Sequence, residues 1–265
     1  MPAATRFKEL DYLGQKWNAQ VDRPIAEMGF YQRAHMFAEL AFASYWAKDY
    51  MLELCQHFGF QELSYFDFDG AQTYVIGNQH DTVVTCRGTE ATDWNDIRAD
   101  LKVWKVLAET DGKVHGGFTD EVDHLWPDLE EMLRSNEKPV YFTGHSLGGA
   151  MAQICAARCK LSEIRSEPQE IQTFGSPRVG DRRYVNYCKL SRIRWINNND
   201  FVPRFPPALF GYRHTGLEMY IDHRGQISGL SGMGKIADGL AGFAIPERPE
   251  IWPRWSMYIS SPVCR

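Results

Sequence analysis

The sequence predicts an α/β fold with a mostly parallel central sheet, antiparallel edge strands and helices on both faces. From about residue 120 onward, short β-rich runs alternate with helical patterns, and this alternation is typical of parallel strands joined by crossover helices. Earlier, the runs Thr73 to Gly77 and Asp81 to Arg87 flank the turn residues 78–80, which predicts an antiparallel hairpin. Helices must then cover both faces of the parallel part.

Length and composition are those of a folded protein. With 265 residues, 44% hydrophobic and 24% charged, the chain can bury a large core, so we expect a single domain over residues 1–265 with a divergent tail at about 240–265. The net charge of −5 argues against nucleic acid as a partner. No stretch approaches the ~18 apolar residues of a transmembrane span and no signal peptide is visible, so a cytoplasmic and a secreted location both stay open.

Hydrophobic periodicity predicts the individual elements. Apolar residues recur at three- and four-residue steps from Tyr31 to Phe58, which indicates one long helix or two consecutive helices closed by Gly59. The alternating elements that follow are expected as a helix near Asp120 to Ser135, a strand at Pro139 to Thr143, a helix at Ser146 to Lys160, a strand at Glu170 to Phe174, a helix near Arg182 to Lys189, and strands at Ser191 to Ile196 and Gly216 to Ile221.

The most informative segment runs from Gly144 to Gly148 and fits the G-x-S-x-G pattern of a nucleophile elbow. A predicted strand leads into Ser146 and a predicted helix leads out of it, so we expect a strained turn that presents the serine hydroxyl at the top of the sheet. Glycines suit such a turn because the strand and helix backbones approach closely. The free N–H of Leu147, at the helix start, would face the negative charge of a tetrahedral intermediate. A plain turn built from small residues is the alternative.

A serine nucleophile needs a histidine base and a carboxylate that supports it, in the chain order Ser, Asp, His for this arrangement. Asp200 meets the second requirement, because it ends the polar loop after the strand at 191–196. A turn-capping role after three asparagines is its structural alternative. Asp181 is the competing carboxylate, and we expect it to start the helix near Arg182 to Lys189.

Six segments between about Tyr74 and Asp222 resemble the class-3 triacylglycerol lipase family, the fungal-lipase-like branch of the α/β hydrolases. They are Thr85 to Thr89 with Asp93 and Trp94 after it, Val114 to Phe118, Thr143 to Gly149, Thr173 to Asp181, Asn199 to Pro207, and Tyr212 to Gly216. The resemblance implies an α/β-hydrolase fold, with Ser146 as the nucleophile and Asp200 as the triad acid. It also implies that Thr89 supplies the second oxyanion donor, opposite the N–H of Leu147.

The stretch at about 90–104 stands where such lipases keep a lid. Its apolar residues are spaced three and four apart with acidic residues beside them, which predicts an amphipathic helix. The apolar stripe consists of Trp94, Ile97, Leu101 and Trp104, and the acidic residues are Asp93, Asp96 and Asp100. Such a helix could cover an acyl pocket in water and turn toward lipid at an interface. An ordinary surface helix is the alternative.

The catalytic histidine departs from the family pattern. Relatives carry it near the C-terminus, but the corresponding region, Arg248 to Ile259, contains no histidine. Only His214 and His223 follow Asp200, and His214 matches a family position that is structural. His223 comes just past a predicted strand, where many α/β hydrolases place the base, so we rank it first. His115 and His145 match family positions that are not bases. An absent base remains a third possibility.

The function expected from these residues is that of a lipase or esterase acting on acylglycerols or short-chain esters, with no metal or cofactor. Its partner would be an ester or lipid substrate at a lipid-water interface. The alternative is a catalytically impaired lipid- or ester-binding protein that lacks a competent base. The cysteines have no zinc spacing, and we expect mostly buried thiols at Cys55, Cys86, Cys155, Cys159, Cys188 and Cys264.

Overall fold

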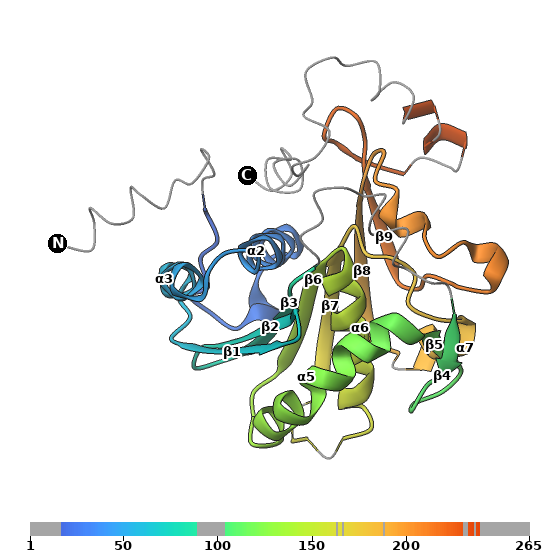
Figure 1. Cartoon of the computed structure of the whole chain (residues 1–265). Coiled ribbons are helices and arrows are strands. Elements are labelled where there is room, and N and C mark those ends of the chain that lie inside the picture. Colours follow the sequence, from blue (N-terminus) through green and yellow to red (C-terminus); the bar gives the residue numbers. More distant parts are fainter. Residues whose placement is uncertain are drawn as a thin grey trace.

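The centre of the fold is an eight-stranded sheet (Figure 1). The structure is a computed structural model that describes residues 17–88, 104–162, 164, 165, 167–187, 189–229, 233–235, 237 and 238. In sheet order the strands are β1 (Glu62–Phe68), β2 (Ala71–Gly77), β3 (Thr82–Cys86), β6 (Val140–His145), β7 (Pro168–Phe174), β8 (Ser191–Asn197), β9 (Leu217–Ile221) and β10 (Ile227–Ser228). A separate hairpin pairs β4 (Lys105–Leu107) with β5 (Lys113–His115).

Pairing is parallel from β3 through β6, β7 and β8 to β9, and antiparallel at both ends of the sheet. The prediction of a mostly parallel sheet with antiparallel edge strands is therefore confirmed. The carboxyl ends of five neighbouring strands meet at one edge, where ligands bind in open α/β sheets. This carboxyl edge is the place to look for chemistry.

Helices cover both faces of the sheet (Figure 1). On one face lie α2 (Phe30–Ala43) and α3 (Lys48–Phe58), and on the other lie α5 (Gly116–Arg134) and α6 (Leu147–Cys159). Neighbouring strand residues divide between two cores because their side chains alternate across the sheet. Tyr141 packs 5.9 Å from Phe37 of α2, between ring centroids, whereas Phe142 belongs to the core beneath α5 and α6.

Most predicted elements are confirmed, with ends shifted by a few residues. The apolar pattern from Tyr31 to Phe58 forms two helices, and Gly59 ends the second at a φ of 101°. A side chain at Gly59 would also meet the carbonyl oxygen of Val21, 2.6 Å from an added Cβ. Asp181 caps the short helix α7 (Arg182–Tyr187), where it accepts a hydrogen bond of 3.0 Å from the Tyr184 N–H. Several elements have no counterpart among the predicted ones: β1, the β4–β5 hairpin, β10 and the 3₁₀ helices η2 (Ile25–Glu27), η3 (Val202–Arg204) and η4 (Ala208–Phe210).

Four of the predicted thiols, Cys55, Cys86, Cys155 and Cys159, are free and buried, which confirms the expectation for them. Cys188, Cys264, most of the proposed lid and the tail at about 240–265 lie outside the described residues. Trp104, the last residue of the predicted amphipathic stripe, is described and directly precedes β4. Among the helices that are described, none has the length and apolar character needed to cross a membrane.

A buried carboxylate fastens the chain before α2 to the helix. Glu39 is fully buried and accepts hydrogen bonds from the backbone N–H groups of Asn18 (2.9 Å) and Ala19 (2.8 Å). Its Oε1 also lies 3.1 Å from Nε2 of His35, one turn earlier on α2. Because buried N–H groups need acceptors, this carboxylate fixes the course of residues 18 and 19.

We expect the substitution Glu39→Gln to destabilise the fold by about 1–3 kcal/mol, because an amide NH₂ cannot accept the hydrogen bonds that a carboxylate oxygen accepts here. Urea unfolding would measure the change, with the exposed Glu27→Gln as the matched control. Equal unfolding midpoints for the two variants would contradict the assignment.

Candidate active site

Ser146 occupies a strained turn at the carboxyl end of β6. Its φ of 53° and ψ of −128° lie outside the regions that ordinary residues favour, and it is 3% exposed. The turn is held from both sides, because the Ser146 N–H donates to the carbonyl of Phe174 on β7 and its own carbonyl accepts from the Gly149 N–H, both at 3.0 Å. The next residue, Leu147, begins α6. This is the strand-turn-helix arrangement of a nucleophile elbow.

The two glycines of the motif are required by close backbone contacts. A Cβ on Gly144 would lie 2.4 Å from the carbonyl oxygen of Gly148, and a Cβ on Gly148 would lie 2.1 Å from that of Cys86 on β3. Both distances are far below van der Waals contact, and both partners are backbone atoms that cannot rotate away. The start of α6 therefore lies directly against β3 and β6, which aims the first turn of the helix at the serine.

Of the two proposed oxyanion donors, Leu147 and Thr89, the structure describes Leu147. Leu147 is the first residue of α6, so its N–H belongs to the helix terminus, where partial positive charge collects. Thr89, the expected second donor, lies outside the described residues. The chain just before it is described, and a Cβ added to Gly88 would lie 3.3 Å from the Cβ of Ser146. The strand β3 thus leads the chain past the nucleophile immediately before position 89.

Asp200 lies at the same edge, beyond β8. A Cβ added to Gly175, just past the end of β7, would lie 2.4 Å from Oδ2 of Asp200 and 3.6 Å from the ring of His145. The carboxylate is therefore next to the β7 end, one strand away from Ser146. Its other oxygen, Oδ1, accepts a hydrogen bond of 3.0 Å from the N–H of Val202, so Asp200 also caps the turn that follows.

Three histidines are held neutral by desolvation, of which His115 is buried and His145 and His214 are half-buried. Burial lowers the pKa of His145 to about 3 and that of His115 to about 4, and burial together with Arg194 lowers the pKa of His214 to about 3. Nδ1 of His145 is hydrogen-bonded to the Tyr45 hydroxyl at 2.9 Å. Nε2 of His214 donates to the carbonyl oxygen of Pro203 at 2.7 Å, which is the packed, structural role expected for it.

His223 pairs with a carboxylate that the sequence analysis did not single out. Its Nδ1 is hydrogen-bonded to Oδ1 of Asp238, and its backbone N–H lies 3.2 Å from each oxygen of the same carboxylate. The Tyr220 hydroxyl donates to Oδ2 of Asp238 at 2.8 Å. Burial alone would raise the pKa of Asp238, but the hydrogen bonds from His223 and Tyr220 lower it below its ordinary value. No sequence motif links these residues, so only the fold reveals the pair.

The sheet register sets the distance that His223 must cover. Ile221 on β9 pairs with Asn197 on β8, so His223 and Asp200 leave neighbouring strands at the carboxyl edge. The strand β9 is three places from β6, which at ~4.8 Å per strand separates them by about 14 Å. In the described arrangement the ring is directed to Asp238. A role for His223 as the base would therefore require the turn between β9 and β10 to move toward Ser146.

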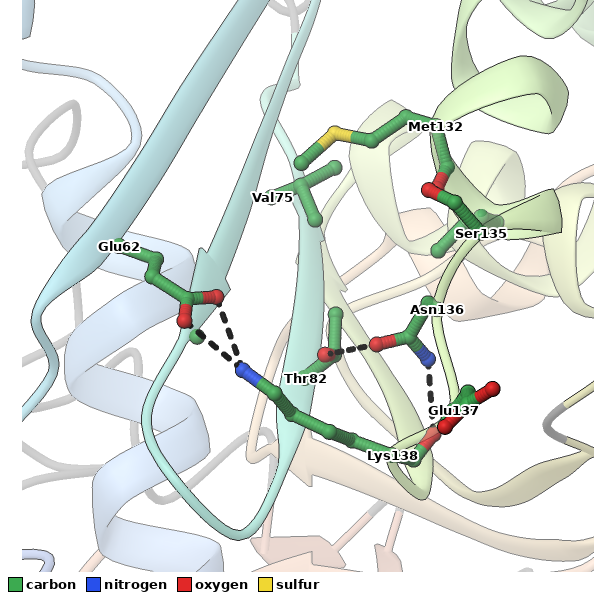
Figure 2. Close-up of a pocket in the computed structure, with 10 residues that line it drawn as sticks. Glu62, Val75, Thr82, Met132, Ser135, Asn136, Glu137 and Lys138 are labelled. Carbon is green, nitrogen blue, oxygen red and sulfur yellow. Dashed lines mark hydrogen bonds and ion pairs between the residues drawn. The ribbon is translucent and has the colours of Figure 1, made fainter.

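A pocket of about 450 Å³ lies at the opposite edge of the sheet, where β3 and β6 begin (Figure 2). Four of its polar side chains pair with one another, since Lys138 Nζ contacts both carboxylate oxygens of Glu62 at 2.9 Å and the Thr82 hydroxyl donates to Asn136 at 2.8 Å. The length of β6 separates this pocket from Ser146, so it is not part of the candidate active site.

A strained serine between β6 and α6, at the carboxyl edge of a parallel sheet covered on both faces, defines the architecture of an α/β hydrolase. A family model described as Lipase (class 3) matches residues 83–210 of this chain. The chain is 40% identical to a lipase of Rhizomucor miehei over 119 residues, which cover 41% of this chain and 33% of that protein. It is 30% identical to the secreted mono- and diacylglycerol lipase MDL3 of Malassezia globosa over 223 residues, or 76% of this chain and 71% of the relative.

Among solved structures, the Rhizomucor miehei triacylglyceride lipase superposes with a TM-score of 0.59 and 26% identity, covering 71% of this chain and 78% of that one. The chain belongs to the class 3 lipase family. The matched segments span only about a third of the length of the first curated relatives, from Rhizomucor miehei and Fusarium solani.

The neutral histidines His145 and His214 predict an acid-sensitive fold. A histidine with a lowered folded pKa contributes its full stability above about pH 6.5 and loses it as the pH falls toward about 3, because the unfolded chain binds the proton first. We expect the free energy of unfolding to fall between pH 7 and pH 5 by about 2 kcal/mol for each of His145 and His214. Urea unfolding at the two pH values, with His214→Gln as the comparison, checks this. An unchanged pH dependence in the variant would contradict it.

Proposed function

We propose that this protein is a serine carboxylic-ester hydrolase that cleaves acylglycerols or short-chain esters through an acyl-enzyme on Ser146. The observation that carries the proposal is the backbone of Ser146, a non-glycine residue held at positive φ between β6 and α6. Strain of this kind persists where the surrounding structure enforces it, and it clusters at active sites. Membership of the class 3 lipase family supports the same chemistry.

In the proposed reaction, Oγ of Ser146 attacks the ester carbonyl carbon while His223 accepts the hydroxyl proton. The carbonyl oxygen becomes an oxyanion, which the Leu147 N–H and Thr89 would stabilise. The intermediate collapses as His223 returns the proton to the departing alcohol, and water then hydrolyses the acyl-serine by the same route. Asp200 is the proposed carboxylate of the triad. Because Nδ1 of His223 pairs with Asp238, the ring must exchange Asp238 for Asp200 as its turn approaches Ser146.

The proposed substrates are lipids at a lipid-water interface. The relatives are named as a mono- and diacylglycerol lipase and a triacylglyceride lipase, and one structural neighbour is described as a triacylglycerol lipase with a serine-protease triad. We include in the proposal a lid at about 90–104 and the secretion that the names of two relatives indicate. No metal or cofactor takes part in the proposed reaction.

A second candidate is an ester- or lipid-binding protein with little turnover. One observation favours it. The ring of His223 is hydrogen-bonded to Asp238, and the strand before it, β9, lies three places from β6, which carries Ser146. A site with the elbow and oxyanion donors but no working base would still bind esters, with only residual acceleration over water.

The test of the nucleophile is Ser146→Ala. We expect hydrolysis of p-nitrophenyl butyrate and tributyrin to fall at least about 10³-fold, because the acyl-enzyme can no longer form. Labelling by a fluorophosphonate should disappear in the same variant. Ser135→Ala, an exposed hydroxyl at the far end of α5, is the matched control and should keep full activity. A wild-type rate equal to that of Ser146→Ala would establish the second candidate.

The base and its carboxylate are tested with four further variants. We expect His223→Ala and Asp200→Asn each to lower kcat at least about 10³-fold, and Asp238→Asn to have the smaller effect, because Asp238 holds the ring only before the exchange. His124→Ala, on the exposed side of α5, is the control. Full activity of His223→Ala would remove that residue from the mechanism. A larger loss in Asp238→Asn than in Asp200→Asn would make Asp238 the carboxylate of the triad.

A further inference from the structure

Exposed apolar side chains gather beside the β4–β5 hairpin. Leu209 is 90% exposed and Phe210 is 57% exposed, both on η4, and Leu107 on β4 is 80% exposed. Isolated exposed apolar residues are common, but these come from two segments that lie side by side. Nζ of Lys105 donates to the carbonyl of Phe210 at 2.7 Å, which links β4 to η4.

Three basic side chains bond to carbonyl oxygens of the segment that carries these apolar side chains: Lys105, Arg178 and Arg213. Arg213 Nη1 donates to the carbonyls of Ala208 and Tyr212 at 2.7 Å, and Arg178 Nη1 donates to that of Pro206 at 2.9 Å. A carbonyl satisfies a donor without neutralising its charge. The cations therefore crowd together, and burial and then the nearby Arg194 and Arg213 lower the pKa of Arg178.

Acidic residues of the adjoining segments are already paired with other cations. On the hairpin, Glu109 lies 3.2 Å from Arg158 and Asp111 lies 2.7 Å from Arg183. On β9, the carboxylate of Glu218 contacts Arg194 at 3.1 Å. Asp181 accepts backbone N–H bonds at the start of α7. The described surface around η4 thus carries an excess of positive charge on a chain whose net charge is −5.

The hydrogen bonds of Lys105 and Arg213 also fix the backbone of η4, which carries Leu209 and Phe210. Arg213 and Lys105 fasten the carbonyls at the two ends of η4, and Gly211 ends it at a φ of 81°. With its backbone bonded to the protein, η4 presents Leu209 and Phe210 to solvent without having to reorganise. The chain reaches η4 from Asp200 through η3.

We propose that Leu107, Leu209 and Phe210, with the basic residues Lys105, Arg178 and Arg213 beside them, form a docking surface for a lipid layer that carries negative charge. The apolar side chains would enter the boundary between head groups and acyl chains, while the cations meet anionic head groups. Local positive charge on a negatively charged protein also orients it, so that η4 and the β4–β5 hairpin face the lipid. This inference rests on the proposed function, because it supplies the surface on which that reaction would take place.

The experiment measures binding without turnover, using the full chain with Ser146→Ala and flotation with phosphatidylcholine vesicles that contain or lack phosphatidylglycerol. We expect binding to the vesicles with phosphatidylglycerol, weakened by salt. Adding Leu209→Ser and Phe210→Ser should lower the partition at least about tenfold, because two apolar side chains no longer enter the layer. Arg213→Gln should lower binding to the anionic vesicles alone.

The matched control replaces two exposed leucines elsewhere, Leu52→Ser on α3 and Leu161→Ser after α6, and should bind as the parent does. Equal binding by the η4 variant and the control would overturn the proposal, as would a parent chain that binds neither kind of vesicle. Hydrolysis of soluble p-nitrophenyl butyrate, measured with Ser146 intact, reports separately on the proposed function. If the protein cleaves this ester but does not float with the vesicles, the proposed function stands and only the docking surface is contradicted.

Discussion

The close contact between the start of α6 and the ends of β3 and β6 is the constraint on which the rest of the structure depends. The carbonyl of Cys86 occupies the space that a side chain at Gly148 would need. With the helix pressed this close, the connecting residue has no room for an ordinary turn, and Ser146 takes a φ of 53° at a cost of about 1–3 kcal/mol. The parallel register of β3, β6 and β7 supplies that energy, because the elbow is bonded to Phe174 on the neighbouring strand.

Local signals predicted most of the fold, and nonlocal contacts account for what they missed. In the helices and parallel strands around Ser146, the apolar residues recur with the spacing typical of each element, so the type and order of these elements follow from the sequence. The strand β1 has a mixed pattern of partly buried residues, and the three-residue strands β4 and β5 are too short for any period to appear. Such elements owe their existence to their partners in space, and a single sequence does not display those partners.

The same division applies to the site. Ser146 and Asp200 were predictable because each follows a recognisable strand, and the structure brings both to the carboxyl edge. Asp238 was not predictable, because its bonds to His223 and Tyr220 depend on how the chain folds back after β10. The pairing of Tyr45 with His145 is another contact between distant segments, which joins the end of α2 to the residue before the nucleophile.

Electrostatics distinguish the histidines more sharply than their positions do. Burial removes His115, His145 and His214 from titration near neutral pH, since a ring with a pKa of about 3 or 4 takes up a proton only from strong acid. A base needs the opposite environment, in which a carboxylate supports the imidazolium. At the described carboxyl edge, His223 has such a partner in Asp238. In the proposed mechanism the ring of His223 exchanges Asp238 for Asp200, and because three strands separate His223 from Ser146, its turn must move before the proton is transferred.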